Sequence, residues 1–296
     1  MRVFVTGASG WIGSATVVEL VTAGHDVVGL ARSEGSASSI QEKGAKAILG
    51  SLDDLDSLRR GAEGADAVIH LANKHDWANL AETDRAERVA VQTLAECLVG
   101  TNRAFVVSNG FYGLVEVRPA TEEDPAPWVG PDAPRGGSEN LALDYVSRGV
   151  RTIITRFAPT VHGAGNLGFI KRLVSAAQSH RVSCYVGDGS HAWSAAHRSD
   201  VARLIRLGIE KAPAGSRLHG VAEEAVATRS IAEAIGAALG LPVQSIAPED
   251  ADRHFGFVGR FFSMEMSASS AWTQALLSWY PTGPTLIEDI LAGAYN

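Results

Sequence analysis

A glycine-rich turn close to the N-terminus constrains the fold more than any other feature of this sequence. The glycines of "TGASGWIG" recur every three residues, directly after the apolar run Arg2–Val5 and at the start of the helical pattern Gly10–Ala23. The first glycine permits a tight turn, the second lets the backbone approach a pyrophosphate, and the third allows helix and strand to pack closely. Free N–H groups at the start of the helix then face the phosphates, so the turn predicts a dinucleotide site. The residues assigned to this site are Gly7, Ser9, Gly10, Trp11, Ile12 and Gly13.

Short apolar runs alternate with helical patterns through the first half of the chain. The runs expected to form strands are Arg2–Val5, His25–Leu30, Ala45–Leu49, Ala67–Leu71, Arg103–Val107 and Thr152–Arg156. The stretches expected to form helices are Gly10–Ala23, Ser36–Lys43, Leu55–Ala62, Arg85–Gly100 and Ser138–Arg148. This alternation is typical of βαβ units, and near-continuous apolar strands indicate that both faces of the sheet are covered. The sequence therefore predicts an α/β fold with a doubly wound parallel sheet of the Rossmann type.

The alternation loosens after about Ala158. Helical patterns continue, separated by loops that contain glycine and proline, at Phe169–Ser179, Asp200–Lys211 and Ser230–Leu239. We expect a smaller C-terminal substrate lobe that lies over the carboxyl edge of the sheet, because ligands of such sheets bind at that edge. The dinucleotide-binding domain would then span residues 1–158 with parts of 190–215, and the substrate lobe mainly residues 159–296.

Composition and charge narrow the classes of partner. Of the 296 residues, 46% are hydrophobic and 20% are charged, a balance that can bury a full core, and the net charge is −7. A nucleic-acid-binding surface needs the opposite sign of charge. No apolar run has the length of a membrane span, no leader precedes the first strand, and Cys97 and Cys184 fit no metal or redox spacing. We expect a cytoplasmic protein with a small-molecule partner and without metal, nucleic acid or membrane.

The end of the second predicted strand indicates which dinucleotide binds. An acidic side chain at that point would accept a hydrogen bond from the 2′-hydroxyl of the ribose. This sequence instead has Arg32, followed by Ser33. A guanidinium suits a 2′-phosphate, and the serine hydroxyl can add a hydrogen bond, whereas the alternative is a solvated surface arginine. The sequence therefore favours NADP over NAD.

Six segments in a consistent order resemble the extended branch of the short-chain dehydrogenase/reductase superfamily, alongside nucleotide-sugar epimerases, dihydroflavonol reductases and atypical relatives. They are the glycine turn, "GSLDD" at 50–54, "DAVIHLAN" at 66–73, "VVSNGFYG" at 106–113, "RFAPTVHG" at 156–163, and "VGDG" at 186–189 with "AAHRSDVARL" at 195–204. The resemblance places Ser108 on the family's catalytic serine, and family members often form homodimers through the helices 85–100 and 138–148. It also implies cofactor contacts for Ser51, Leu52, Leu71, Ala72, Asn73, Phe157, Ala158 and Thr160.

The catalytic pair of the family is missing. Family members carry Tyr-x-x-x-Lys at the start of the helix before the sixth strand, where the spacing puts both side chains on one face. None of the five tyrosines here has a lysine four residues later, and Arg135 and Glu139 occupy the expected place. Arginine is a poor proton donor but a good clamp for an anion or a carbonyl oxygen. Glu139 could act as a base if burial raised its pKa, or it could only complement the helix dipole after Ser138.

Other side chains could replace the missing pair. His75 follows Asn73 at the carboxyl edge, and imidazole titrates near neutral pH, although a loop histidine is often only solvated. Aromatic residues recur in the predicted loops, and "HFGFVGRFFSMEM" at 254–266 is either a lid over the cleft or part of the lobe core. Aromatic side chains that face the cleft would favour an apolar ligand over a nucleotide sugar.

Two functions are therefore open. The first is an NADP-dependent oxidoreductase that transfers a hydride between nicotinamide and a small, largely apolar carbonyl or alcohol. Ser108 would hold the substrate oxygen, while Arg135, Glu139 or His75 would replace the missing pair. The second is a non-catalytic sensor that binds NADP, which the absence of the pair favours. Epimerase or dehydratase chemistry on a nucleotide sugar is a third interpretation that the missing base disfavours.

Overall fold

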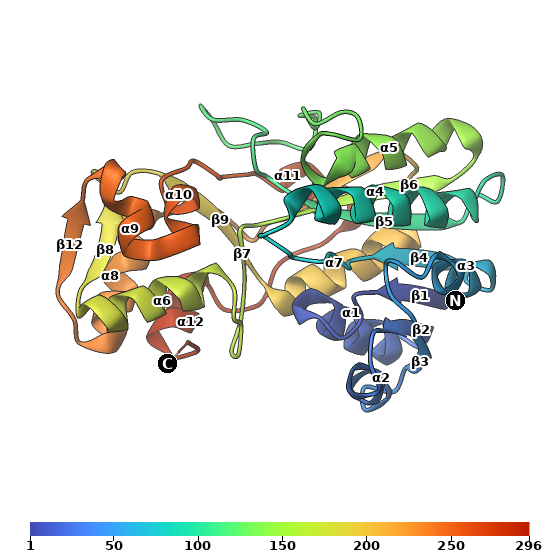
Figure 1. Cartoon of the computed structure of the whole chain (residues 1–296), viewed down its shortest axis with the longest axis horizontal. Coiled ribbons are helices and arrows are strands. Elements are labelled where there is room, and N and C mark those ends of the chain that lie inside the picture. Colours follow the sequence, from blue (N-terminus) through green and yellow to red (C-terminus); the bar gives the residue numbers. More distant parts are fainter. Residues whose placement is uncertain (296) are drawn as a thin grey trace.

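A seven-stranded parallel sheet forms the centre of the computed structural model, which describes residues 1–295 (Figure 1). The strand order is β10-β6-β5-β4-β1-β2-β3. The chain builds outward from β1 in both directions, so a crevice is expected at the carboxyl ends of β1 and β4, where the order reverses. The strands are β1 Arg2–Thr6, β2 Asp26–Ala31, β3 Lys46–Leu49, β4 Ala67–His70, β5 Ala104–Gly110, β6 Arg151–Phe157 and β10 Ser216–Gly220.

Helices cover both faces of the sheet and create two separate apolar cores. One core is formed with α1 Trp11–Thr22, α2 Glu34–Gln41 and α7 Arg198–Lys211. The opposite core is formed with α3 Leu55–Glu63, α4 Leu80–Glu96 and α5 Ser138–Asp144, which continues as a 3₁₀ turn at Tyr145–Arg148. The central strands supply side chains to both cores, which explains their near-continuous apolar sequences. The predicted Rossmann-type architecture is confirmed.

Two details of the sheet domain differ from the prediction. Helix α4 begins at Leu80 rather than Arg85, because the side chain of Asn79 caps it by accepting from the Glu82 amide. The seventh strand, β10, was not predicted. Its sequence "SRLHG" is polar, yet the imidazole of His219 donates a hydrogen bond to the Ser269 carbonyl and the guanidinium of Arg217 donates to the buried carboxylate of Glu139. Tertiary partners therefore allow a polar strand to pair with β6 at the edge of the sheet.

The smaller lobe contains two small sheets in addition to the predicted helices. Its strands are β7 Thr160–His162, β8 Ser183–Val186, β9 Ala192–His197, β11 Glu223–Ala227 and β12 Val243–Ile246, in the orders β11-β9-β7 and β12-β8. Its helices are α6 Phe169–His180, α8 Thr228–Leu239, α9 Ala251–Phe255, α10 Gly259–Phe262 and α12 Leu286–Leu291. Short strands of small and polar residues, such as "AWSAAH", carry little signal of their own. They are held by a lobe core in which Trp193 and Phe262 are buried.

The chain crosses between the two parts repeatedly (Figure 1). After β6 it enters the lobe, returns to the sheet domain with α7 and β10, and re-enters the lobe with β11. Helix α11, Ala271–Leu277, then packs against α7 and β10 before α12 closes the lobe. Within residues 1–295, no helix has the combination of length and hydrophobicity that crossing a bilayer requires.

Candidate active site

A cleft of about 980 Å³ lies between the carboxyl edge of the sheet and the lobe. On the sheet side it is lined by the glycine turn and by residues at the ends of β4, β5 and β6. On the lobe side it is lined by His162, Phe169 and Tyr295, among others. The loop after β4 and the segment before α5 reach into the same cleft through His75 and Arg135. The cleft therefore occupies the position that the strand order predicts for a ligand.

The glycine turn at one end of the cleft leaves space for phosphates. Gly7 has φ +68°, and a Cβ on Gly13 would lie 2.0 Å from the carbonyl oxygen of Gly7, so neither position accepts another residue without a shift. Helix α1 begins after Gly10, and no side chain caps its first N–H groups. Uncapped amides beside a side-chain-free turn fit a pyrophosphate. The predicted residues that line the cleft here are Gly7, Ser9, Gly10, Trp11, Ile12 and Gly13.

The predicted adenosine end of the cleft carries Arg32, Ser51 and Leu52. Arg32 is exposed, and among residues 1–295 its guanidinium makes no hydrogen bond or ion pair. Ser33 is placed differently from the prediction: its hydroxyl caps α2 by accepting from the Ser36 amide at 3.2 Å, and it does not line the cleft. Ser33 was predicted as a phosphate ligand from its position after Arg32. Its hydroxyl instead accepts from a free N–H group in the first turn of α2.

The opposite end of the cleft contains the residues implied for the nicotinamide side. Ser108 lies near the end of β5, is buried, and lines the cleft. The other residues that the resemblance implied and that line the cleft are Leu71, Ala72, Asn73, Phe157, Ala158 and Thr160. Together with Ser108 they lie near or just after the ends of β4, β5 and β6, three neighbouring strands whose carboxyl ends meet at one edge of the sheet. Among residues 1–295, no group of three His, Cys, Asp or Glu side chains is arranged to hold a metal ion.

Arg135 enters the cleft from a left-handed turn rather than from a helix. Arg135, Gly136 and Gly137 have φ of 55°, 60° and 61°, and α5 begins only at Ser138. A non-glycine residue in this region is strained, so surrounding contacts must hold it. The backbone N–H of Arg135 donates to Asp84 at 2.8 Å, and its Nη2 donates to Glu87 at 2.6 Å. The guanidinium is thereby fixed against helix α4 with its side chain 29% exposed.

Glu139 does not share a helical face with Arg135 and does not line the cleft. Its side chain is 2% exposed and accepts hydrogen bonds from the guanidinium of Arg156, which is fully buried, at 2.6 and 3.3 Å. It also accepts from Asn109 at 2.8 Å and from Arg217 at 3.3 Å. Glu139 is therefore a buried ion-pair partner of two guanidinium groups and does not face the cleft.

His75 lies at the rim of the cleft with a left-handed backbone, φ 51°. Its backbone N–H donates to the side-chain oxygen of Asn73 at 2.8 Å, which fixes the loop. Desolvation, and secondarily the positive charge of Arg135, hold the pKa of His75 below its ordinary value. The imidazole is therefore neutral at neutral pH and can accept a proton there. Lys74, its neighbour, is paired with Asp53 and Glu82 at 2.8 Å each.

Aromatic side chains form the outer wall of the cleft. Trp77 and Phe169 line it, and Phe257 contacts both, with ring centroids 4.5 Å and 6.3 Å away. The aromatic side chains of segment 254–262 lie in two different places. Phe255 and Phe262 are buried in the lobe core, while Phe257 and Phe261 contact each other and pack against the aromatic wall. The lobe-core interpretation holds for Phe255 and Phe262, whereas Phe257 and Phe261 contact residues of the wall without lining the cleft themselves.

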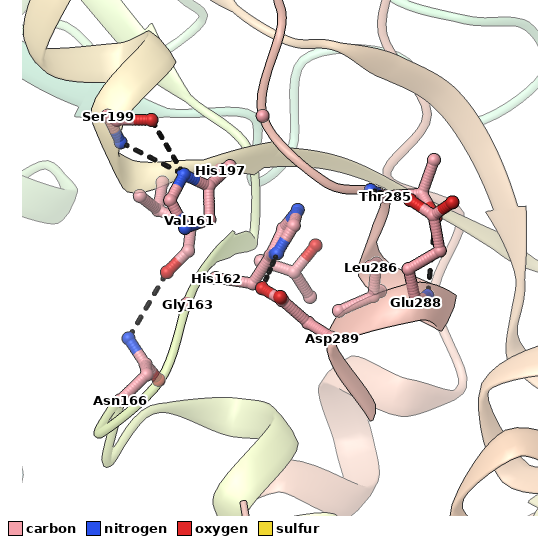
Figure 2. A network of polar contacts seen from close by, with 12 residues as sticks. Val161, His162, Gly163, Asn166, His197, Ser199, Thr285, Leu286, Glu288 and Asp289 are labelled. Carbon is pink, nitrogen blue, oxygen red and sulfur yellow. Dashed lines mark hydrogen bonds and ion pairs between the residues drawn. The ribbon is translucent and has the colours of Figure 1, made fainter. Parts of the chain in front are cut away.

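The lobe side of the cleft depends on the last helix of the chain, as Figure 2 shows. Nδ1 of His162 lies 2.6 Å from a carboxylate oxygen of Asp289 in α12, and burial lowers the pKa of His162. The backbone N–H of Gly163 donates to the hydroxyl of Tyr295, which lines the cleft. No sequence pattern indicates Tyr295 or Phe169 as residues of the cleft, because only tertiary packing brings their segments to it.

The fold and this cleft define a class of Rossmann-type, dinucleotide-binding enzymes of the extended short-chain dehydrogenase/reductase type. The chain belongs to the NAD dependent epimerase/dehydratase family, whose model matches residues 3–219. The match includes the glycine turn, Ser108 and the segment that carries Arg135 and Glu139. The predicted family resemblance is therefore confirmed.

Relatives with assigned activities include reductases and a dehydrogenase. The chain is 41% identical to an uncharacterized protein of Schizosaccharomyces pombe, over 100% of both chains. It is 29% identical to the 4-hydroxy-2-methyl-3-oxo-4-farnesyl-3,4-dihydroquinoline-1-oxide ketoreductase of Stigmatella aurantiaca, over 73% of this chain and 66% of the relative. Among solved structures, MoeE5 in complex with UDP-glucose and NAD superposes with a TM-score of 0.75 at 24% identity, over 99% of this chain and 97% of the other.

Proposed function

We propose that this protein is an NADP(H)-dependent oxidoreductase that interconverts a small, largely apolar carbonyl compound and its alcohol. The observation that carries the proposal is the meeting of Ser108 and the fixed guanidinium of Arg135 in one cleft with the glycine turn. The ketoreductase relative supports the reaction class. The solved complex of MoeE5 with NAD supports the position of a nicotinamide dinucleotide in this fold.

Three side chains of the cleft, Ser108, Arg135 and His75, have roles in the proposed reaction. A bound nicotinamide dinucleotide supplies a hydride to the carbonyl carbon in reduction and accepts one from the alcohol carbon in oxidation. The Ser108 hydroxyl and the Arg135 guanidinium donate hydrogen bonds to the substrate oxygen, on which negative charge grows as the hydride arrives. His75 delivers the proton that converts the alkoxide to the alcohol, and it accepts that proton in the reverse direction.

The lowered pKa of His75 gives the two directions opposite pH dependences. Reduction needs the imidazolium form, which is lost as the pH rises through the pKa of His75 in the folded protein. Oxidation needs the neutral imidazole, which is lost as the pH falls through the same value. At neutral pH the neutral form predominates, so the proposed assignment favours alcohol oxidation there and carbonyl reduction at lower pH.

Arg32 supports NADP as the cofactor. Its exposed guanidinium lines the predicted adenosine end of the cleft, and no acidic residue ends β2. The aromatic wall of Trp77 and Phe169 supports an apolar substrate, because such side chains offer contact area but few hydrogen bonds.

The test is a turnover assay with purified protein, NADPH or NADH, and a panel of apolar ketones, aldehydes and alcohols. We expect consumption of NADPH with at least one carbonyl compound, and loss of about 100-fold in kcat/KM for Ser108→Ala. Ser199→Ala is the matched control, since Ser199 is an exposed serine that does not line the cleft. Turnover that is unchanged in Ser108→Ala would remove Ser108 from its proposed role.

A sensor that binds NADP without turnover is the second candidate. One observation favours it: the place of the family's lysine is taken by Glu139, whose charge is engaged by Arg156 behind the cleft. Calorimetry of NADPH binding, combined with the turnover assay, separates the two candidates. Tight NADPH binding together with no turnover across the panel would favour the sensor, whereas turnover would exclude it.

A further inference from the structure

The carboxylate of Glu87 lies at a junction between the two segments that carry the candidate catalytic side chains. Glu87 is on α4, and its side chain is fully buried. Its Oε1 accepts from Nη2 of Arg135 at 2.6 Å, and its Oε2 accepts from Nδ2 of Asn73 at 3.1 Å. A buried carboxylate is costly unless it is paired and hydrogen-bonded, and both oxygens of Glu87 are engaged.

The first branch of this junction fixes Arg135. Three residues on one face of α4 hold the left-handed turn: Asp84 accepts from the Arg135 amide, Glu87 accepts from its guanidinium, and Arg88 donates to the Gly136 carbonyl at 2.7 Å. The spacing of three and four residues along α4 brings these side chains to one side of the helix. Nη2 is thereby occupied, whereas Nη1 of Arg135 makes no hydrogen bond within residues 1–295 and is not buried. The contact leaves one amino group of the guanidinium for a ligand.

The second branch reaches His75. The side-chain amide of Asn73 donates to Glu87 and, through its oxygen, accepts from the backbone N–H of His75 at 2.8 Å. This orientation of the amide is the one that satisfies both contacts. The left-handed backbone of His75 is therefore held by a side chain that Glu87 itself orients.

Behind the junction, His70 supplies no competing charge. Its Nδ1 lies 2.8 Å from the Thr6 hydroxyl, and its Nε2 is 3.8 Å from Glu87 without a hydrogen bond. Burial lowers the pKa of His70, so it is neutral at neutral pH. Arg135 is then the cation that compensates Glu87, and the two charges depend on each other.

We propose that Glu87 is a positioning residue for catalysis, holding both the guanidinium of Arg135 and the loop of His75 in the cleft where they act on the substrate oxygen. The inference rests on the proposed function, in which those two side chains act on that oxygen. Relatives place their pair on one helix; here two separate loops carry the two groups, and a buried carboxylate joins them. Glu87 does not line the cleft, so it acts through Arg135 and Asn73 rather than on the substrate itself.

The kinetic test compares Glu87→Gln with Glu96→Gln, the same substitution on the same helix at an exposed glutamate that pairs with Arg148. We expect Glu87→Gln to keep its NADPH Kd and to lose about 100-fold in kcat, because displacement of a catalytic group by about 1 Å costs that much. Glu96→Gln should keep both values. A Glu87→Gln enzyme with wild-type kcat would overturn the proposal.

Chemical rescue keeps the test informative if Glu87→Gln folds poorly. Guanidinium ion added to Arg135→Ala should restore part of the lost kcat, because the vacated space retains the Glu87 carboxylate. The double variant Glu87→Gln/Arg135→Ala should show no rescue. Equal rescue in both backgrounds would mean that Glu87 does not hold the guanidinium, and would refute the assignment.

A measurement without turnover separates this inference from the proposed function. Phenylglyoxal modifies free guanidinium groups, and peptide mass spectrometry follows Arg135 alone. We expect faster modification of Arg135 in Glu87→Gln than in the wild type and an unchanged rate in Glu96→Gln. If Arg135 is modified faster in Glu87→Gln but the wild-type protein is inactive, the proposed function is wrong and the contact between Glu87 and Arg135 is supported. If the rate of modification is unchanged in Glu87→Gln, Glu87 does not hold Arg135.

Discussion

Glu139 accepts a hydrogen bond of 2.6 Å from Nη2 of Arg156, and both side chains are withdrawn from solvent. The pair joins the start of α5 to β6, and Arg217 extends it to β10. Glu139 also orients Asn109, which lines the cleft. The position that the family resemblance assigns to the catalytic lysine therefore joins the sheet to a helix in this protein.

Removal of the Glu139 charge should destabilise the protein. We expect Glu139→Gln to lower the free energy of unfolding by about 3 to 5 kcal/mol, because Arg156 would remain buried without a counter-charge. Urea unfolding followed by circular dichroism measures the change. The double variant Glu139→Gln/Arg156→Met should be more stable than Glu139→Gln, since it removes the orphaned cation. A loss in Glu139→Gln no larger than that of an exposed pair, about 1 kcal/mol or less, would contradict the structural role.

A methyl group at Gly13 should abolish dinucleotide binding. The Cβ of Gly13→Ala would lie 2.0 Å from the Gly7 carbonyl oxygen, so the turn must open and its amides must leave their places. We expect no detectable NADPH binding by calorimetry. Gly35→Ala is the matched control, because a Cβ on Gly35 meets no atom within 4 Å and the residue lies in α2. If Gly13→Ala binds NADPH with wild-type affinity, the phosphates of the cofactor do not bind at this turn.

Loss of the Arg32 guanidinium should change cofactor preference. Arg32→Ala is expected to weaken NADPH binding about tenfold, which corresponds to about 1.4 kcal/mol, and to leave NADH binding unchanged. The comparison uses Arg253→Ala, a substitution of an exposed arginine in the lobe. If the ratio of the two affinities stays the same in Arg32→Ala, the guanidinium does not contact the 2′-phosphate.

Acid should destabilise the protein through His219. Burial lowers the pKa of His219 to about 3, and the Ser269 carbonyl lies 2.7 Å from its Nδ1. Between its unfolded value, about 6.5, and its folded value the unfolded chain binds a proton that the folded protein does not, so stability falls as the pH falls. The contribution is about 1.4 kcal/mol for each pH unit within this window. Urea titrations across the window should show a shallower slope for His219→Gln, and an identical slope would exclude His219 as the source.

The sheet domain was predictable because its signals are local. Apolar strands such as Ala67–His70, the turn around Gly10 and the alternation with helices each depend on residues near in sequence. The strand β10 was missed for the opposite reason: Arg217 and His219 are tolerated only because Glu139 and the Ser269 carbonyl meet them across the fold.

The candidate site was predictable in part. The glycine turn could be found from its spacing directly after a strand, and Ser108 from the resemblance of "VVSNGFYG" to a family motif. The roles of Arg135 and Glu139 could not be separated by their spacing, because a left-handed turn ends before α5 begins and directs the two side chains to different places. Glu87 had no sequence signal at all. A glutamate within a charged helix is usually solvated, and only the approach of Arg135 and Asn73 makes it a buried junction.

The repeated passage of the chain between sheet and lobe has a consequence for engineering. Neither part is one continuous stretch of polypeptide, because α7, β10 and α11 of the sheet domain are encoded between elements of the lobe. A hybrid with a foreign lobe would need several junctions instead of one. Specificity is therefore easier to alter by point changes along the cleft wall than by transplanting the whole cap.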